Sequence, residues 1–175
     1  MRLDTWVWGN ERILWGQNSS DKYTVKILEP KVGRFGCLSL QYHDNKDETW
    51  VVIQGEVWAL IVREDGTVCT KIMKPGDVQN LPSGMIHRLM GVTEDCRVLE
   101  ASSLDEHAAD KSVEKDVVRL DCVYGRHTKN SIDSKITNLC KKYTEEAIIA
   151  VINECPIPQY YPERFADVNV YRPSY

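Results

Sequence analysis

Short apolar segments alternate with turn signals between about Tyr23 and Val123, at a spacing of roughly 8 to 12 residues. The turn signals between them read PKVG at 30–33, HDNKDE at 43–48, EDG at 64–66, KPGD at 74–77, PSG at 82–84 and GVTED at 91–95. Regular spacing of this kind is typical of an antiparallel sandwich or barrel. The pattern therefore predicts a mainly β fold for this part of the chain.

Three of the apolar segments predict a meander. Thr49–Ile53 and Glu56–Val62 are rich in Trp, Val and Ile, and Gln54-Gly55 between them offers a residue that tolerates positive φ, so we expect these two strands to pair as a hairpin. Thr67–Met73 follows Asp65-Gly66, a dipeptide suited to a two-residue primed turn, and is expected to continue the sheet. Residues 104–115 are polar and predict a surface loop that contains His107, followed by a last strand over 116–123.

The pattern changes after Arg126. Apolar residues recur at intervals of three and four between about Asp133 and Glu154, which indicates one helix or two, the second starting at Thr144. Prolines end this region, and the Tyr-rich tail that runs to Tyr175 is expected to pack on the domain or on a partner subunit. We therefore divide the chain into a barrel over 1–126 and a helical, Tyr- and Pro-rich extension over 127–175.

Composition narrows the classes of partner. The formal charge is −4, and no Lys/Arg cluster offers the basic stripe that a nucleic acid or an anionic membrane requires. The N-terminal residues show no secretory signal pattern, and no apolar run approaches membrane-spanning length, so a cytoplasmic location is expected. The six cysteines form no C-x-x-C pair and are interpreted as free thiols, and only four histidines are available for metal chemistry.

Four residues can form one metal shell. Gln41 and His43 are two residues apart, so both can face the inside of a barrel, and a turn can return Glu48 from the adjoining strand. His87 would complete a set of one amide oxygen, two imidazoles and one carboxylate, which suits Zn²⁺, Fe²⁺, Mn²⁺ or Ni²⁺.

The spacing of these residues resembles the two motifs of the cupin superfamily. The first motif, G-x5-H-x-H-x3-4-E-x6-G, is represented by Gln41-x-His43-x4-Glu48-x6-Gly55, with Gln in place of the first His. The second motif, G-x5-P-x-G-x2-H, is matched by Gly76, Pro82, Gly84 and His87. This resemblance implies a single jelly-roll β-barrel, to which the C-terminal helical extension is added.

The flanking segments resemble the type II mannose-6-phosphate isomerase cupin over about residues 7–126. The segments that carry this likeness are Trp8-Gly9, Tyr23–Lys26, Leu38–His43, Glu48–Trp50, Pro82–Leu89 and Asp116–Arg126. The resemblance implies that Gln41, His43, Glu48 and His87 bind one divalent metal ion, with Zn²⁺ as the first choice. The chain departs from the family pattern beside this site, where it has Asp44, Asn45, Lys46, Asp47 and Thr49.

The activity that this resemblance implies is the interconversion of aldose and ketose phosphates through an enediol. Lys46 and Glu100 are the candidate catalytic groups, and the sugar phosphate would meet cations at the barrel mouth. The cations placed by the resemblance are Lys26, Arg88, Arg119 and Arg126. Arg88 adjoins His87, so in a regular strand it points to the opposite face. Structural ion pairs with Asp116 or Asp121 are the alternative role for Arg119 and Arg126.

Two other functions remain open at this point. The altered residues around the site favour a cupin that binds a sugar or a nucleotide sugar without turnover, and a cupin dioxygenase would need iron with an open coordination face. A homodimer is expected, because cupins commonly pair through their sheets.

Overall fold

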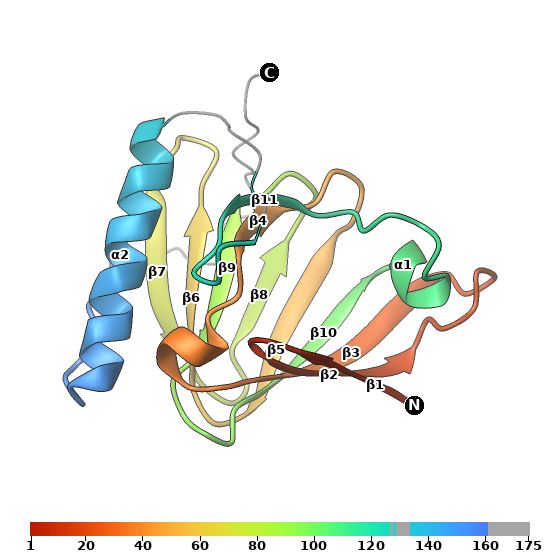
Figure 1. The fold of residues 1–175 in the computed structure, drawn as a ribbon, viewed down its shortest axis with the longest axis horizontal. Coiled ribbons are helices and arrows are strands. Elements are labelled where there is room, and N and C mark those ends of the chain that lie inside the picture. Colours follow the sequence, from red (N-terminus) through yellow and green to blue (C-terminus); the bar gives the residue numbers. More distant parts are fainter. Residues whose placement is uncertain (127, 129–133, 161–175) are drawn as a thin grey trace.

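The computed structural model describes residues 1–126, 128 and 134–160, and it folds them into two antiparallel sheets that face each other, with one long helix outside (Figure 1). The larger sheet has the order β1 (Arg2–Trp6), β2 (Gly9–Trp15), β3 (Tyr23–Pro30), β10 (Arg97–Ser103), β5 (Glu48–Gln54) and β8 (Val78–Leu81). The smaller sheet has the order β11 (Val118–Asp121), β4 (Leu40–Tyr42), β9 (His87–Gly91), β6 (Val57–Val62) and β7 (Val68–Met73). The predicted mainly β barrel is confirmed.

Strand β6 shows why the sequence patterns are not uniformly alternating. All six of its residues are buried. Val57, Ala59 and Ile61 point into the space between the two sheets, whereas the residues between them belong to a second apolar cluster on the outer face of the smaller sheet. Because both faces of this strand are covered, it reads as a continuous apolar run.

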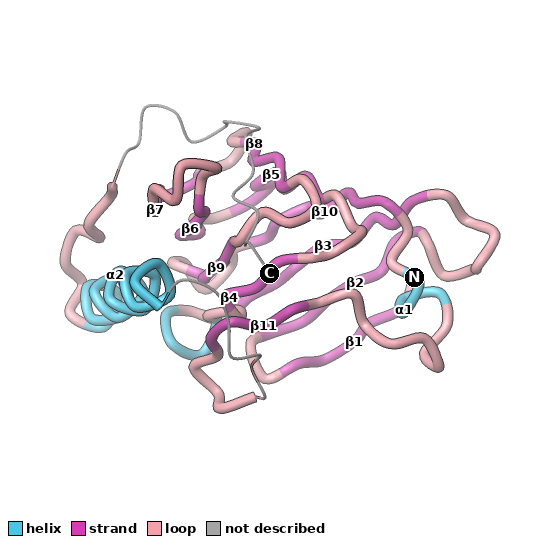
Figure 2. The backbone as a smooth tube through the Cα atoms, turned by 90° about the horizontal axis from the view of Figure 1, so that it is seen from above, coloured by secondary structure: helices cyan, strands magenta, loops and turns pink. Residues whose placement is uncertain are grey.

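The second cluster lies under helix α2 (Ser134–Ile152), which covers the outer face of the smaller sheet (Figures 1 and 2). Its buried residues Cys140, Ala147 and Ile148 pack with Trp58 and Leu60 of β6. The helix is continuous, so Thr144 starts no second helix and instead donates its hydroxyl to the carbonyl of Cys140. Among the described residues, no helix is long and apolar enough to cross a bilayer.

The chain after α2 returns to the barrel. Tyr160 pairs with Thr70 of β7, and its ring stacks on Tyr143 with the centroids 3.8 Å apart. The remainder of the predicted tail, 161–175, lies outside the described residues.

One predicted strand pairing is wrong. β6 and β7 form the expected hairpin at Asp65-Gly66, but β5 does not pair with β6: it pairs with β10 and β8, and the two strands belong to different sheets. Gly55 adopts a φ of +65° and lies so close to Cys96 and Thr93 that an added Cβ would be 2.3 Å from Thr93 Oγ1. Gly55 therefore lies in a connection that passes from one sheet to the other, and not in a hairpin turn.

The polar segment 104–117 crosses the open end of the barrel. It contains the short helix α1 (Glu106–Ala109), whose first turn is capped by the Asp105 side chain, which accepts from the backbone N–H of Ala108. The only other short helical turn among the described residues is the 3-10 helix η1 (Gly33–Gly36), which packs against α2.

Candidate metal centre

Strand register places one half of the site on the smaller sheet. Arg119 of β11 lies directly opposite Gln41 of β4, and Gln41 lies directly opposite His87 of β9. Directly opposed residues in antiparallel strands share a face. These three side chains consequently form a row on the inner face, and His43 follows two residues after Gln41 along the chain.

The larger sheet supplies the other half. Glu100 of β10 lies opposite both Lys26 of β3 and Trp50 of β5, and Glu48 lies opposite Ser102 in the neighbouring row. Trp50 belongs to the core between the sheets, so its row faces inward. Charged groups are thus buried against the end of the apolar core.

Both imidazoles are held with one nitrogen available as a ligand. Nδ1 of His87 donates to the backbone carbonyl of Met85 at 2.8 Å, and Nδ1 of His43 donates to the carbonyl of Asp116. When such a ring is neutral, Nδ1 carries the proton and Nε2 is the nitrogen that can bind a metal ion. The two Nε2 atoms lie 3.3 Å and 3.7 Å from the Glu48 carboxylate for His43 and His87, respectively.

This donor set fits a divalent metal ion. One ligand atom each of His43, Glu48 and His87 lies within 4.8 Å of the other two, and all three side chains are buried. Nε2 of His87 is buried without a hydrogen-bond partner, which is costly unless another group uses its lone pair. Burial holds the pKa of His87 down to about 4, which outweighs the opposing effect of Glu48 and keeps the ring neutral. Two imidazoles and a carboxylate are common ligands of Zn²⁺ and of other first-row metals.

Gln41 borders the same space. Its Nε2 lies 3.5 Å from Nε2 of His43, and its Oε1 accepts a hydrogen bond of 2.6 Å from the Ser39 hydroxyl. Rotation of the amide would bring Oε1 toward the histidines, and amide orientation is set by such contacts. Gln41 is therefore placed to act as a fourth ligand.

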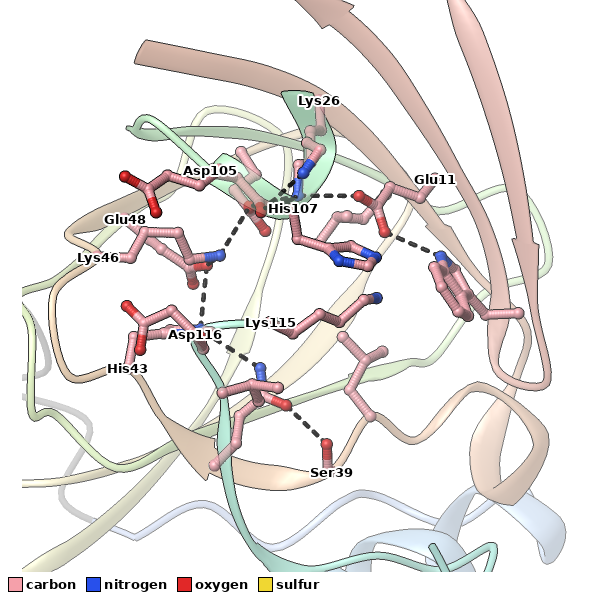
Figure 3. A pocket seen from close by; sticks show the side chains of 18 of the residues that line it. Glu11, Lys26, Ser39, His43, Lys46, Glu48, Asp105, His107, Lys115 and Asp116 are labelled. Atoms are coloured by element: carbon pink, nitrogen blue, oxygen red, sulfur yellow. Dashed lines mark hydrogen bonds and ion pairs between the residues drawn. The ribbon is translucent and has the colours of Figure 1, made fainter. Parts of the chain in front are cut away.

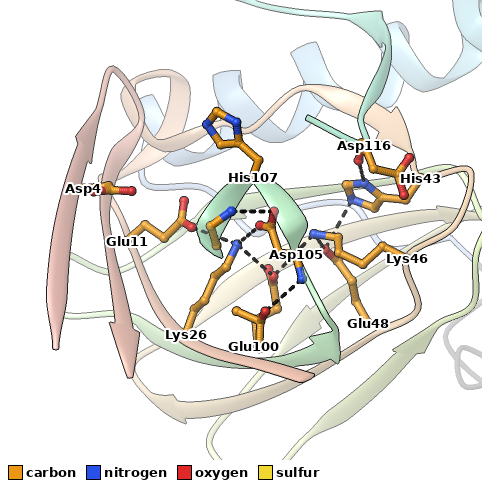
Figure 4. A network of polar contacts seen from close by, with 12 residues as sticks. Asp4, Glu11, Lys26, His43, Lys46, Glu48, Glu100, Asp105, His107 and Asp116 are labelled. Carbon is orange, nitrogen blue, oxygen red and sulfur yellow. Dashed lines mark hydrogen bonds and ion pairs between the residues drawn. The ribbon is translucent and has the colours of Figure 1, made fainter. Parts of the chain in front are cut away.

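A network of buried ions extends from Glu48 across the barrel (Figure 4). The ammonium of Lys46 pairs with Glu48 and lies 3.6 Å from Glu100. The ammonium of Lys26 lies 2.9 Å from Glu11 and 3.8 Å from Glu100, and it also pairs with Asp105. Two lysines thus connect four carboxylates.

Glu48 and Glu100, the two carboxylates near Lys46, have pKa values that are shifted in opposite directions. Burial opposes ionisation of Glu48, but Lys46 and His43 outweigh it and hold the Glu48 pKa well below its usual value. Burial and the neighbouring Glu48 charge raise the pKa of Glu100. Burial opposes the charged form of Lys46, but Glu48 and Glu100 raise its pKa, so it remains an ammonium. A carboxylate pair separated in this way assigns different roles to its members.

These groups line a pocket of about 720 Å³ that opens between the larger sheet and the segment 104–117 (Figure 3). It brings together most of the side chains predicted from the sequence, although His87 is not among the lining residues. Those that line it are Lys26, Gln41, His43, Lys46, Glu48, Glu100, Arg119 and Arg126.

Arg88 is not among the lining residues. It is fully buried, and its guanidinium donates to Thr144 of α2 at 2.9 Å and to the Asp121 carboxylate at 2.7 Å. The strand alternation that turns His87 inward turns Arg88 toward the helix. The placement of Arg88 as a substrate-binding residue is therefore corrected: its guanidinium is committed to holding α2 and β11 on the barrel.

Arg119 and Arg126 have no carboxylate within ion-pair distance in the described part of the chain. Asp121 pairs with Arg88 and Lys141, and the Asp116 carboxylate accepts from the backbone N–H groups of Asp44 and Asn45. Burial and the nearby charge of Arg126 lower the pKa of Arg119. The ion pairs considered for these arginines are therefore not formed, and both guanidiniums lie at the pocket wall.

The sequence did not single out several residues of this site. Glu11 and Asp105 neutralise Lys26, and the carbonyl of Asp116 orients His43. Trp6 and Lys115 also line the pocket. No fixed spacing connects these residues to the histidines, because they come from β1, β2 and the loop 104–117.

Comparison with known proteins defines the class. The family described as Cupin matches residues 29–117, half of the chain, and the chain belongs to this family. A germin-like protein of Morus alba is 30% identical over 63 residues, which are 36% of this chain and 30% of that protein.

Solved structures show the same fold. The capsular polysaccharide assembling protein CapF of Staphylococcus aureus aligns with a TM-score of 0.55 at 14% identity, over 69% of this chain and 34% of CapF. An oxalate decarboxylase of Lactobacillus farciminis, solved as a formate complex, gives 0.53 at 14% identity, over 69% of this chain and 33% of that protein. The oxalate decarboxylase OxdC of Bacillus subtilis gives 0.52 at 20% identity, over 69% of this chain and 30% of OxdC. The aligned part of this chain spans about a third of each of these proteins.

Proposed function

We propose that this cupin is a metal-dependent isomerase that interconverts an aldose phosphate and a ketose phosphate. One observation carries the proposal: His43, Glu48 and His87 cluster beside a pocket whose walls hold Glu100, a carboxylate of raised pKa, and two guanidiniums that have no carboxylate partner among the described residues. Metal, base and anion-binding groups are the parts that this reaction requires.

The binding roles follow from position. Arg119 shares its row with Gln41, and Arg126 donates to Ser39, the residue that fixes the Gln41 amide. A phosphate held by the two guanidiniums would place the rest of the sugar over Gln41 and the histidines. The planar fork of arginine suits this role, because it can donate to two phosphate oxygens at once.

The metal ion would be held by His43, Glu48 and His87, with Gln41 beside them. When bound, it supplies the polarisation of a carbonyl and a hydroxyl oxygen that makes the neighbouring C–H acidic.

Glu100 is assigned as the base. In the aldose, Glu100 removes the proton from C2 and a C1–C2 enediolate forms; the O2 proton then passes to O1, and return of the C2 proton from Glu100 to C1 gives the ketose. Atoms and charge balance, and no redox partner is needed. The raised pKa makes Glu100 a stronger base than an ordinary carboxylate.

Lys46 is assigned as a cation and not as a base. Its pKa is raised, and its Nζ lies between Glu48 and Glu100. An ammonium in this place can donate to an oxygen that gains negative charge as the enediol forms.

The test is turnover of a panel of sugar phosphates, beginning with mannose 6-phosphate, by protein loaded with Zn²⁺, Mn²⁺ or Fe²⁺. Aldose–ketose conversion is expected, with exchange of the C2 proton into deuterated water. No conversion and no proton exchange with any member of the panel would overturn the proposal.

Two matched substitutions separate the roles. Glu100→Gln should lower kcat by about 10²-fold or more and leave metal content unchanged, because it removes only the base. Ser102→Ala, a change on the same strand face, should retain most of the activity.

A second candidate is a sugar-binding cupin without turnover. It is favoured by the ion pair of Lys46 with Glu48, which uses a carboxylate oxygen that a metal ion would need. Sugar phosphate binding that persists without metal, together with absence of proton exchange, would select this candidate.

A further inference from the structure

Lys115 places an ammonium in the lining of the pocket, and none of the described carboxylates pairs with it. Its Nζ lies 3.8 Å from the centroid of the Trp6 ring, and within the described ranges no carboxylate oxygen comes within 4.0 Å of it. Figure 3 shows Lys115 extending away from His43 toward the wall that carries Glu11. Trp6 itself is fixed, because its indole N–H donates to Glu11 at 2.9 Å.

The neighbouring lysines do not share this condition. Lys26 is neutralised by Glu11 and Asp105, and Lys111 pairs with Asp4 at 3.0 Å. Burial, together with the charges of Lys26 and Lys111, lowers the pKa of Lys115 to about 8, against the opposing pull of Glu11. The ammonium of Lys115 is thus a partly desolvated cation that an anion would stabilise.

This position is separate from the two guanidiniums. Arg119 belongs to the smaller sheet, and the charged groups that affect its pKa are Arg126 and Cys122. Lys115 lies against Trp6 of β1, at the edge of the larger sheet. The charged groups that affect its pKa include Glu11, Lys26 and Asp105. Considering the described residues alone, the pocket therefore has cations without carboxylate partners on two walls, with the candidate metal ligands and the neutralised lysines between them.

We propose that Lys115, seated on Trp6, forms a second anion-binding subsite, so that the preferred substrate is a sugar with two anionic groups, such as a bisphosphate. The identity of the ligand as a sugar rests on the proposed function, whereas the presence of two anionic groups rests on the two separate cation positions. A pocket of about 720 Å³ has room for such a ligand, since small-molecule sites commonly measure roughly 300–1,000 Å³.

The probes are fructose 6-phosphate and fructose 1,6-bisphosphate, titrated calorimetrically into metal-loaded protein; because O1 of the bisphosphate is esterified, it reports binding and not turnover. The wild type should bind the bisphosphate at least ten-fold more tightly. Lys115→Met should abolish that preference while leaving the Kd of the monophosphate unchanged, and Arg119→Met should weaken binding of both.

Two controls isolate the subsite from general charge. Lys111→Met removes the same charge from an exposed lysine of the same loop and should preserve the preference. Lys115→Arg keeps a cation on the indole ring and should also preserve it, which shows that the loop tolerates substitution.

The outcomes are decisive in both directions. Equal affinity of the wild type for the two probes overturns the inference, as does a Lys115→Met variant that loses monophosphate binding to the same extent as Arg119→Met, because one anion would then contact both cations. Turnover of monophosphates without any preference for the bisphosphate leaves the proposed function intact and rejects the second subsite. If the protein prefers the bisphosphate but turns over no sugar phosphate of the panel, the second subsite is supported and the proposed isomerase function is rejected.

Discussion

Arg88 and Asp121 are joined by an ion pair of 2.7 Å behind the strand that carries His87. β9 thus contributes a metal-ligand candidate on its inner face and a clamp for α2 and β11 on its outer face. The position of the candidate ligand His87 and the attachment of helix α2 are consequently linked, because they depend on adjacent residues of β9.

Replacement of Arg88 should destabilise the fold. Arg88→Met removes hydrogen bonds to Thr144 and Asp121 and is expected to lower the free energy of unfolding by about 3 kcal/mol. Urea denaturation measures this change. Arg97→Met breaks an exposed pair with Glu29 and should cost less than about 1 kcal/mol. Equal losses in both variants would contradict the assigned clamp.

The candidate metal site is tested by measuring how much metal the protein and its variants bind. His43→Ala and His87→Ala should each reduce bound metal from about one ion per chain to a small fraction of that, because one imidazole ligand is lost. Elemental analysis after dialysis against limiting Zn²⁺ gives the content. His107→Ala, a pocket histidine outside the cluster, should retain the ion. Unchanged content in the His43/His87 double variant would place the metal elsewhere.

Gly55 is expected to tolerate no side chain. Gly55→Ala combines a φ of +65° with a Cβ only 2.8 Å from Cys96 Cα, so it should lower the free energy of unfolding by more than about 2 kcal/mol. Gly76→Ala is the matched control, because its φ is +94° but no atom lies within 4 Å of the added Cβ. It should cost about 1 kcal/mol. Chemical denaturation of both variants checks the difference, and equal costs would show that the close approach has no effect.

Asp105 predicts a pH dependence of stability. Burial opposes its ionisation, but Lys26 and Lys46 outweigh it and lower the Asp105 pKa in the folded state. The unfolded state therefore binds the proton more readily, so this carboxylate stabilises the fold above its ordinary pKa of 3.8 and loses that effect as pH falls toward the folded value.

Asp105→Asn should accordingly cost about 2 kcal/mol at pH 7, and the difference from the wild type should shrink below about pH 4. Urea denaturation at both pH values measures it. Glu114→Gln, which changes an exposed carboxylate of the same loop, is the control and should change little at either pH. A penalty for Asp105→Asn that stays constant with pH would contradict the role of the charge.

The sequence predicts that His43, Glu48 and His87 lie together, and the structure groups these three side chains. Gln41 and His43 share a face by strand alternation, and the spacing that links Glu48 and His87 to them is fixed by the two motifs. Apolar periodicity also located α2, because its buried stripe repeats within a single element.

Other parts of the fold depend on which sheet a strand joins, and local patterns do not contain that information. Gln54-Gly55 has the composition of a hairpin turn, yet β5 and β6 enter different sheets. Lys115 and Trp6 are more than a hundred residues apart and meet only because the loop 104–117 folds over β1. The homodimer stays a prediction.

Because both faces of β6 are buried, the part of the chain that can fold by itself must include the residues that cover both faces. The segment that defines the family ends at 117, but Trp58, Leu60 and Val62 on the outer side of β6 are covered by residues after 134. A fragment cut at the family boundary would expose a broad apolar sheet face and would tend to aggregate. Helix α2, which contributes no residue to the candidate ligand set, therefore covers an apolar face that the family segment alone would leave open.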